Sequence, residues 1–281
     1  MIAVLSALQG STNRCPPGLP LSPSMLWRGS TPLDPKRCAR AAPLPSSLAS
    51  CSNLVPAGTG TASTLAGLRM LVPKLNKSGH PWHHDHTLRI GNFPASACFV
   101  ISLRDPADRM RSGFFYDSAG PGEMTSLFYP TGPNGTRYFI KSISHYLAAL
   151  ADLNHPEHAS AFRNYLSSVA FPEYRNRAVR GVVGGNHFLV SQLDYLHDLR
   201  CGTNSVSFVC TERLDEDLRR LAVRFGLEGF LPVNDMHLNR RINSTHTHTR
   251  SNELSHTERS FINRCLYPWD ATLHDNVCGT P

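Results

Sequence analysis

The segment ACFVISL at residues 97–103 restricts the fold of this chain more than any other feature. It is continuously apolar, whereas a strand with one solvated face alternates apolar and polar residues. A continuous run of this length is typical of a strand covered on both faces, as in a parallel sheet between layers of helices. The Arg-Asp-Pro that follows ends the strand, since proline fixes its own φ and disfavours helix at the residue before it.

Strand and helix patterns alternate around this segment. Upstream, a short strand at residues 51–55 leads through a Pro/Gly/Thr loop into an amphipathic helix at 61–72. Downstream, SVSFVC at 205–210 is a second buried strand, after which we expect Thr211 to cap a helix and Gly226 to close it. The remaining helical patterns lie at 107–116, 138–150, 159–169 and, behind a capping box of Ser255 and Glu258, at 255–265.

This alternation predicts an α/β fold, a P-loop-like three-layer domain with a central parallel sheet and helices on both faces. We expect the domain to occupy residues 51–281. Residues 1–50 are rich in Pro and Ser and hold five basic residues against one acid, so they carry more than half of the net charge of +7. They are expected to be a disordered leader, and a transit peptide or a truncated gene start are alternatives.

Net charge and hydropathy limit the classes of partner that we expect for this chain. Outside the leader the positive balance is small, so it gives no reason to expect a nucleic-acid partner. The chain has no run of about 18 to 20 apolar residues, so no membrane span is expected. Sequence alone leaves the oligomeric state open.

The eight cysteines include no C-x-x-C pair, so a structural zinc site is not expected. Cys201 with Cys210, and Cys265 with Cys278, are close enough in sequence to form small disulfide loops. N-x-[ST] sequons, which suit a secreted chain, occur at Asn76, Asn134 and Asn243. Together they favour an oxidising lumen of the secretory pathway.

The loop before the first predicted helix can bind an anion. Unpaired backbone N–H groups and the positive end of the helix dipole meet there, and hydroxyl groups add donors. No Lys follows the glycines, so a Mg-dependent triphosphate site is disfavoured. The candidate binding residues are Gly58, Thr59, Gly60, Thr61, Ala62 and Ser63.

A second candidate anion site follows the buried strand. Arg104 leaves the strand at its carboxyl end, where open α/β sheets bind ligands, and Ser112 lies on the helix just beyond. The two can converge on one phosphate, the Arg through a charge-assisted fork and the Ser through its hydroxyl. The structural alternative is that Arg104 pairs with Asp105 or Asp108 and that Ser112 packs against the sheet.

The motif R-D-P-x-x-R-x-x-S-x-F-x-Y at residues 104–116, downstream of the P-x-G-T-G-T loop, resembles the sulfotransferases that use 3′-phosphoadenosine-5′-phosphosulfate (PAPS), especially the carbohydrate-directed, Golgi-type group. The resemblance covers residues 51–275. It implies that the loop at 58–63 holds the 5′-phosphosulfate and that Arg104 and Ser112 hold the 3′-phosphate. It also implies transfer of a sulfuryl group to a hydroxyl or amine acceptor, which in this group is a carbohydrate, with PAP as product and no metal.

Sulfuryl transfer needs a base to take the proton of the acceptor. Histidine suits this because its ordinary pKa lies near neutral pH, and the cluster at 80–86 falls between the two nucleotide motifs. His84 is the favoured base, His86 the second choice, and Asp85 a partner that orients the ring. A solvated cluster and a metal site at the same histidines are the alternatives.

Three other functions remain open. Sulfotransferases usually carry a Lys or Arg in the first loop, where this chain has Ala57 or Gly58, so a weakly active or inactive protein that binds PAP or a glycan is the first alternative. A P-loop kinase or nucleoside triphosphatase is the second. A metal hydrolase built on the histidines at 83–86 is the third.

Overall fold

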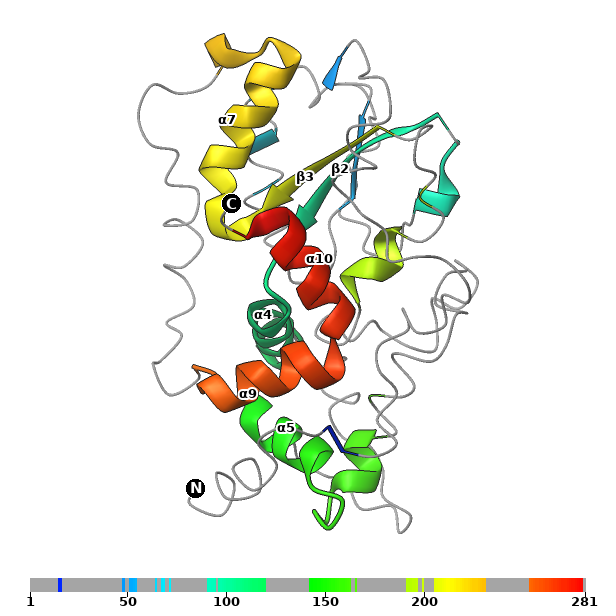
Figure 1. Cartoon of the computed structure of the whole chain (residues 1–281), viewed down its shortest axis with the longest axis vertical. Coiled ribbons are helices and arrows are strands. Elements are labelled where there is room, and N and C mark those ends of the chain that lie inside the picture. Colours follow the sequence, from blue (N-terminus) through cyan, green and yellow to red (C-terminus); the bar gives the residue numbers. More distant parts are fainter. Residues whose placement is uncertain are drawn as a thin grey trace. The chain divides into compact units, whose positions relative to one another are not determined.

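Three parallel strands form a sheet in the order in which they occur in the chain (Figure 1). They are β1 (Cys51–Leu54), β2 (Cys98–Leu103) and β3 (Ser205–Cys210). β2 is central and all six of its residues are buried, as the continuous apolar run predicted. The parallel sheet and its helices confirm the α/β class.

The structure is a computed structural model. It describes residues 15–16, 47–48, 51–54, 64, 67–68, 71, 90–94, 96–119, 142–162, 165, 191–196, 199, 205–230 and 253–279. The helices described are α4 (Pro106–Ala119), α5 (Ile143–Ala151), α7 (Leu214–Phe225), α9 (His256–Phe261) and α10 (Pro268–Cys278). Single turns are η4 (Ile90–Asn92), η8 (Gln192–Leu196), η9 (Thr211–Arg213), η10 (Glu228–Phe230) and the π-helical η12 (Ile262–Leu266).

The chain divides into two compact units, which we name the sheet unit and the helical unit. The sheet unit comprises Gly29–Arg104, Gln192–His248 and Leu273–Pro281, and the helical unit comprises Met1–Arg28, Asp105–Ser191 and Thr249–Thr272. Within the part of the chain that the structure describes, no helix is long and apolar enough to cross a bilayer.

In the sheet unit, apolar residues pack on both faces of the sheet because successive side chains of β2 point to opposite sides. Val100 packs with Leu68 and Leu71 of the predicted 61–72 helix and with Leu218 of α7. Phe99, Ile101 and Leu103 pack on the other side with Leu193 and Leu196 of η8 and Leu273 of α10. Thr64, Gly67, Leu68 and Leu71 are helical, as predicted.

The helical unit has its own apolar core from α4, α5, α9 and η12. Asp105 begins α4, because its carboxylate accepts the N–H of Asp108 and proline occupies the first helical position. Arg259 of α9 forms ion pairs with Asp105 and Asp108. The hydrogen bond to Asp108 raises the pKa of that guanidinium.

Disulfides in the structure correct two sequence predictions. Cys210 pairs with Cys278 and Cys265 with Cys15, so the proposed short loops Cys201–Cys210 and Cys265–Cys278 are wrong. Sequence proximity does not bring these sulfurs together, because Cys210 ends a strand whose neighbour in space is the end of α10. A third disulfide joins Cys51 to Cys98, which face each other across β1 and β2.

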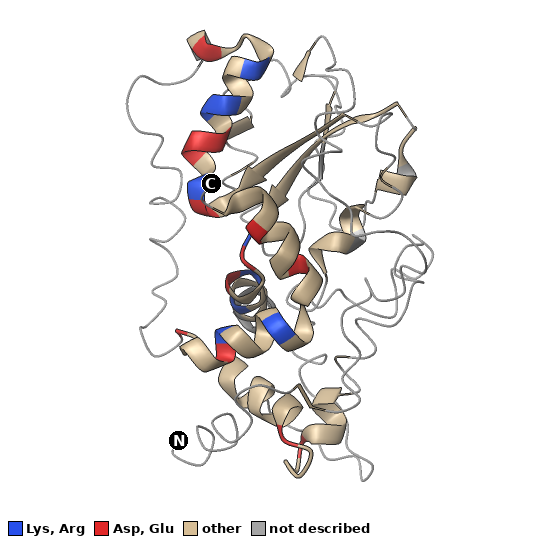
Figure 2. Ribbon diagram, viewed as in Figure 1, with Lys and Arg blue, Asp and Glu red and all other residues tan. Residues whose placement is uncertain are grey.

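The start of α7 also differs from the prediction. Thr211 does not cap this helix; it begins the turn η9, and its hydroxyl donates to the carbonyl of Leu103 on the neighbouring strand at 2.9 Å. Gly226 closes α7 as predicted, with φ of 65° in the left-handed region that favours glycine. Acidic residues occupy the first turn of α7 and Arg224 the last, which complements the helix dipole (Figure 2).

Candidate functional site at the carboxyl ends of the strands

The carboxyl ends of β1 and β2 are direct neighbours. Leu54, the last residue of β1, pairs with Ile101, three positions before Arg104. Adjacent strands lie about 4.8 Å apart, so the chain that leaves β1 starts beside the chain that leaves β2. In open α/β sheets this edge is where ligands bind.

One side-chain contact joins the helix after the predicted anion loop to β2. The hydroxyl of Ser102 donates to Oγ1 of Thr64 at 3.2 Å, and both residues are buried. Thr64 directly follows the predicted loop residue Ser63. Thr64 therefore lies next to the carboxyl end of β2, and its partner Ser102 is two residues before Arg104.

The backbone of Arg104 is held by a side chain that no sequence motif marks. Gln192 of η8 accepts the N–H of Arg104 and donates to its carbonyl, both at 2.8 Å. Gln192 is fully buried, so these bonds are protected from competition by water. These two hydrogen bonds fix the backbone position from which the half-buried Arg104 side chain extends.

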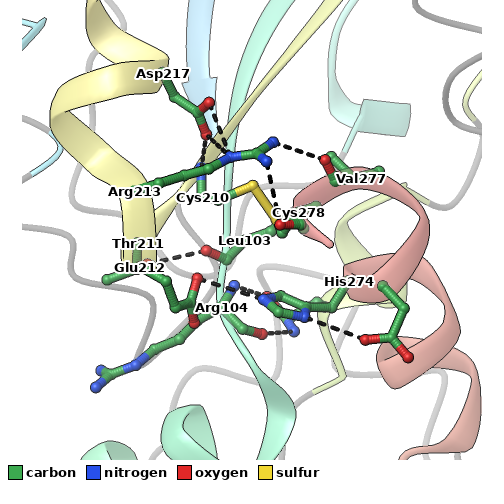
Figure 3. Close-up of a disulfide and its surroundings, with 12 residues drawn as sticks. Leu103, Arg104, Cys210, Thr211, Glu212, Arg213, Asp217, His274, Val277 and Cys278 are labelled. Atoms are coloured by element: carbon green, nitrogen blue, oxygen red, sulfur yellow. Dashed lines mark hydrogen bonds and ion pairs between the residues drawn. A yellow bond between two sulfur atoms is a disulfide. The ribbon is translucent and has the colours of Figure 1, made fainter. Parts of the chain in front are cut away.

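A Glu–His pair lies at the end of the next strand, β3 (Figure 3). Glu212 Oε2 is 3.4 Å from Nε2 of His274 on α10, and Nδ1 of the same ring is 3.7 Å from Asp275. The His274 side chain is 14 % exposed, so the ring is shielded but can reach solvent. A histidine that faces carboxylates can serve as a proton donor or acceptor. No sequence pattern predicted this pair.

Arg213 and the neighbouring disulfide fasten this edge of the sheet (Figure 3). The guanidinium donates to the carbonyls of Val277 and Cys278, which end α10, and to Asp217 of α7. Asp217 in turn accepts the N–H of Cys210 at 2.7 Å. These contacts, with the Cys210–Cys278 disulfide, join β3, α7 and α10, and this role is structural.

The structure describes only some of the predicted site residues. Arg104 lies at the carboxyl end of β2, as predicted. Ser112 is half-buried on α4 in the helical unit. Its convergence with Arg104 on one phosphate stays a prediction. The predicted loop residues Gly58, Thr59, Gly60, Thr61, Ala62 and Ser63, and the histidines His84 and His86, lie outside the described residues.

Asp105 and Asp108, named above as alternative partners of Arg104, form ion pairs with Arg259. Asp105 also accepts a hydrogen bond from Asn263 at 3.0 Å. Both carboxylates are thus engaged with α9 and η12 inside the helical unit.

Comparison of the chain with protein-family models, with curated proteins and with solved structures found no significant match.

Proposed function

We propose that this chain is a PAPS-dependent sulfotransferase that passes a sulfuryl group to a hydroxyl or amine acceptor, a carbohydrate in the first instance. The proposal includes a P-loop-like arrangement of three layers around the parallel sheet. It rests on the sequence resemblance at 58–63 and 104–116 and on one structural observation. That observation is the direct parallel pairing of β1 with β2.

This pairing matters because PAPS carries phosphate groups at both ends of one ribose. A loop that binds the 5′-phosphosulfate and an Arg that binds the 3′-phosphate must lie within one nucleotide of each other. Neighbouring strands with a common carboxyl edge meet this requirement, and the Ser102–Thr64 contact supports it from the helix side. Loop amides at a helix N-terminus would stabilise charge on the leaving phosphate.

The three disulfides support a secretory location, since such bonds persist in oxidising compartments. The Golgi lumen, where this group of enzymes meets its acceptors, is the compartment that we propose.

Thermal denaturation with PAP or ATP·Mg tests the nucleotide assignment. A ligand at about 100 times its Kd stabilises the native state by about 2.7 kcal/mol, which raises Tm by roughly 5 to 10 °C for a chain of this size. We expect PAP to give such a shift and ATP·Mg a much smaller one. Arg104→Ala should lose most of the PAP shift, whereas Arg220→Ala, which removes an exposed Arg of the same unit, should keep it. A larger shift with ATP·Mg would favour the kinase or triphosphatase assignment.

Transfer of label from ³⁵S-PAPS to a glycan panel tests the activity. His84→Ala should abolish transfer while PAP binding persists. His274→Ala is the informative comparison, because the His274 ring lies beside Glu212 at the carboxyl end of β3. Loss of transfer in the His274 variant alone would show that the base is His274, paired with Glu212, and not His84. PAP binding without transfer by the wild type, on an acceptor panel that a known carbohydrate sulfotransferase does modify, would favour the binding-protein alternative.

A further inference from the structure

The helical unit holds a second group of chemically active side chains, away from the nucleotide motifs in the sequence. His145 lies in the first turn of α5, where Ser142 accepts its backbone N–H at 3.1 Å. His155 and Glu157 lie in the turn that follows α5. The N–H of His155 donates to the carbonyl of Asp152, which fixes the course of this turn.

The side-chain donors of this group converge. One ligand atom each from His145, His155 and Glu157 lies within 4.8 Å of the other two. Nε2 of His145 is 2.9 Å from Oε2 of Glu157, and the two imidazole centroids are 5.5 Å apart. The His145 and Glu157 side chains are 25 % and 20 % exposed, so an ion could reach them from solvent.

We propose that His145, His155 and Glu157 form a zinc-binding site. Two imidazoles and one carboxylate are a ligand set that Zn²⁺ prefers, with a fourth position left for water or another ligand. Tetrahedral zinc at about 2.0–2.1 Å from each donor needs the donors roughly 3.3 Å apart. The His145–Glu157 separation of 2.9 Å is close to this value, and all three donors lie within 4.8 Å of one another.

One hydrogen bond of the site involves a candidate ligand atom and would be exchanged for the ion. Backbone N–H of Glu157 donates to Nδ1 of His155 at 3.2 Å, which selects the ring tautomer with a lone pair on Nδ1. Zinc would take that lone pair in place of the long hydrogen bond. It would also lie between His145 and Glu157, which now contact each other directly.

This site is independent of the proposed sulfuryl transfer, which uses no metal, and of the histidines at 83–86. The ligands come from the first turn of α5 and from the turn that follows the other end of this helix. Bound zinc would therefore cross-link α5 to that turn. We therefore expect zinc to stabilise the protein against unfolding.

Zinc titration of the full chain against a chromophoric chelator tests the site, after removal of metal by dialysis. The chain has 14 histidines, so the decisive quantity is the difference between variants in the number of tightly bound equivalents. Glu157→Gln keeps the shape and the backbone N–H, His155→Ala removes a ring, and His256→Ala removes an exposed histidine of the same unit as the control.

Wild type and His256→Ala should bind one tight equivalent more than either site variant. Loss of a direct ligand should weaken that equivalent by more than about 100-fold, since even partners beyond the ligands contribute roughly 10- to 100-fold. Zinc should also raise the Tm of wild type and of the control by more than that of Glu157→Gln. Equal stoichiometry and affinity in wild type and Glu157→Gln, or no tight zinc in wild type, would overturn the proposal.

Discussion

Replacement of Asp217 by Ala should destabilise the sheet unit far more than loss of the acid next to it. The Asp217 side chain is only 5 % exposed and makes two kinds of contact. It accepts the buried N–H of Cys210 at 2.7 Å, and it pairs with Arg213, whose Nε lies 3.1 Å from Oδ1. Glu216 precedes it on α7 and pairs with Arg220 at the surface, where both side chains are more than half exposed.

The expected loss follows from these contacts. A buried N–H left without an acceptor costs about 1–3 kcal/mol. The lost pairing with Arg213 adds about 1 kcal/mol, well below the value for a fully buried pair because the Arg213 side chain is 23 % exposed. We therefore expect Asp217→Ala to lower the free energy of unfolding by about 2–4 kcal/mol. Glu216→Ala should lower it by less than about 1 kcal/mol.

Urea unfolding of the oxidised protein, followed by circular dichroism, measures both losses. For a urea m value of about 2–3 kcal/mol per M, the Asp217→Ala midpoint should fall by roughly 1 M. Asp217→Asn separates the two contributions, because its amide oxygen can still accept the Cys210 N–H while the charge is gone. It should lose less than Asp217→Ala. Equal midpoints for Asp217→Ala and Glu216→Ala would refute the role given to this carboxylate.

Two further predictions concern the helical unit. Ser255→Ala should lower the free energy of unfolding by about 1 kcal/mol, measured in the same way, because Ser255 and Glu258 each accept the backbone N–H of the other in a capping box. Burial, followed by the charge of Tyr267, raises the pKa of Tyr146 and Tyr165. Their hydroxyls ionise above about pH 10 only after unfolding, so the contribution of these two residues to stability should be constant below pH 10 and fall above it by about 1.4 kcal/mol per pH unit for each Tyr. Tyr165→Phe should halve that slope between pH 10 and 11.5, and an unchanged slope would contradict this explanation.

The secondary structure near the sheet was predictable from local patterns. β3 occupies the predicted residues 205–210, and β2 begins one residue later than the predicted 97–103. Both segments are short, rich in β-branched and aromatic residues and free of charge, because the sheet buries both of their faces, so the signal lies in the segment itself. The capping box at Ser255 and the αL glycine at 226 are local in the same way, and both are confirmed.

Contacts between distant segments were not predictable in this way. Gln192 fixes Arg104 across 88 residues of sequence, and nothing in its neighbourhood marks it for that role. Thr211 has a residue type that caps helices, yet its hydroxyl bonds instead to a strand that is adjacent only in the folded sheet. The predicted disulfide pairings were wrong for the same reason. α10, which supplies Cys278, was not recognised as a helix although Pro268 stands at its first residue.

The candidate site was predictable in outline only. Arg104 was found from its position after a buried strand, and the structure confirms that position. Glu212 and His274 could not be paired from sequence, because 62 residues separate them and each residue type is common at helix ends. The donors at 145, 155 and 157 are close in sequence, and their H-x₉-H-x-E spacing was the available signal.

Calorimetric binding of PAP and of adenosine 5′-phosphate to wild type and to Arg104→Ala tests the central claim most directly. The two nucleotides differ by the 3′-phosphate alone, so their affinity ratio isolates the group assigned to Arg104. We predict that wild type binds PAP at least about tenfold more tightly, as expected for a charge-assisted contact of about 1.5–3 kcal/mol. The variant should bind both nucleotides almost equally. No preference for PAP in wild type, or a preference that survives in Arg104→Ala, would contradict the account.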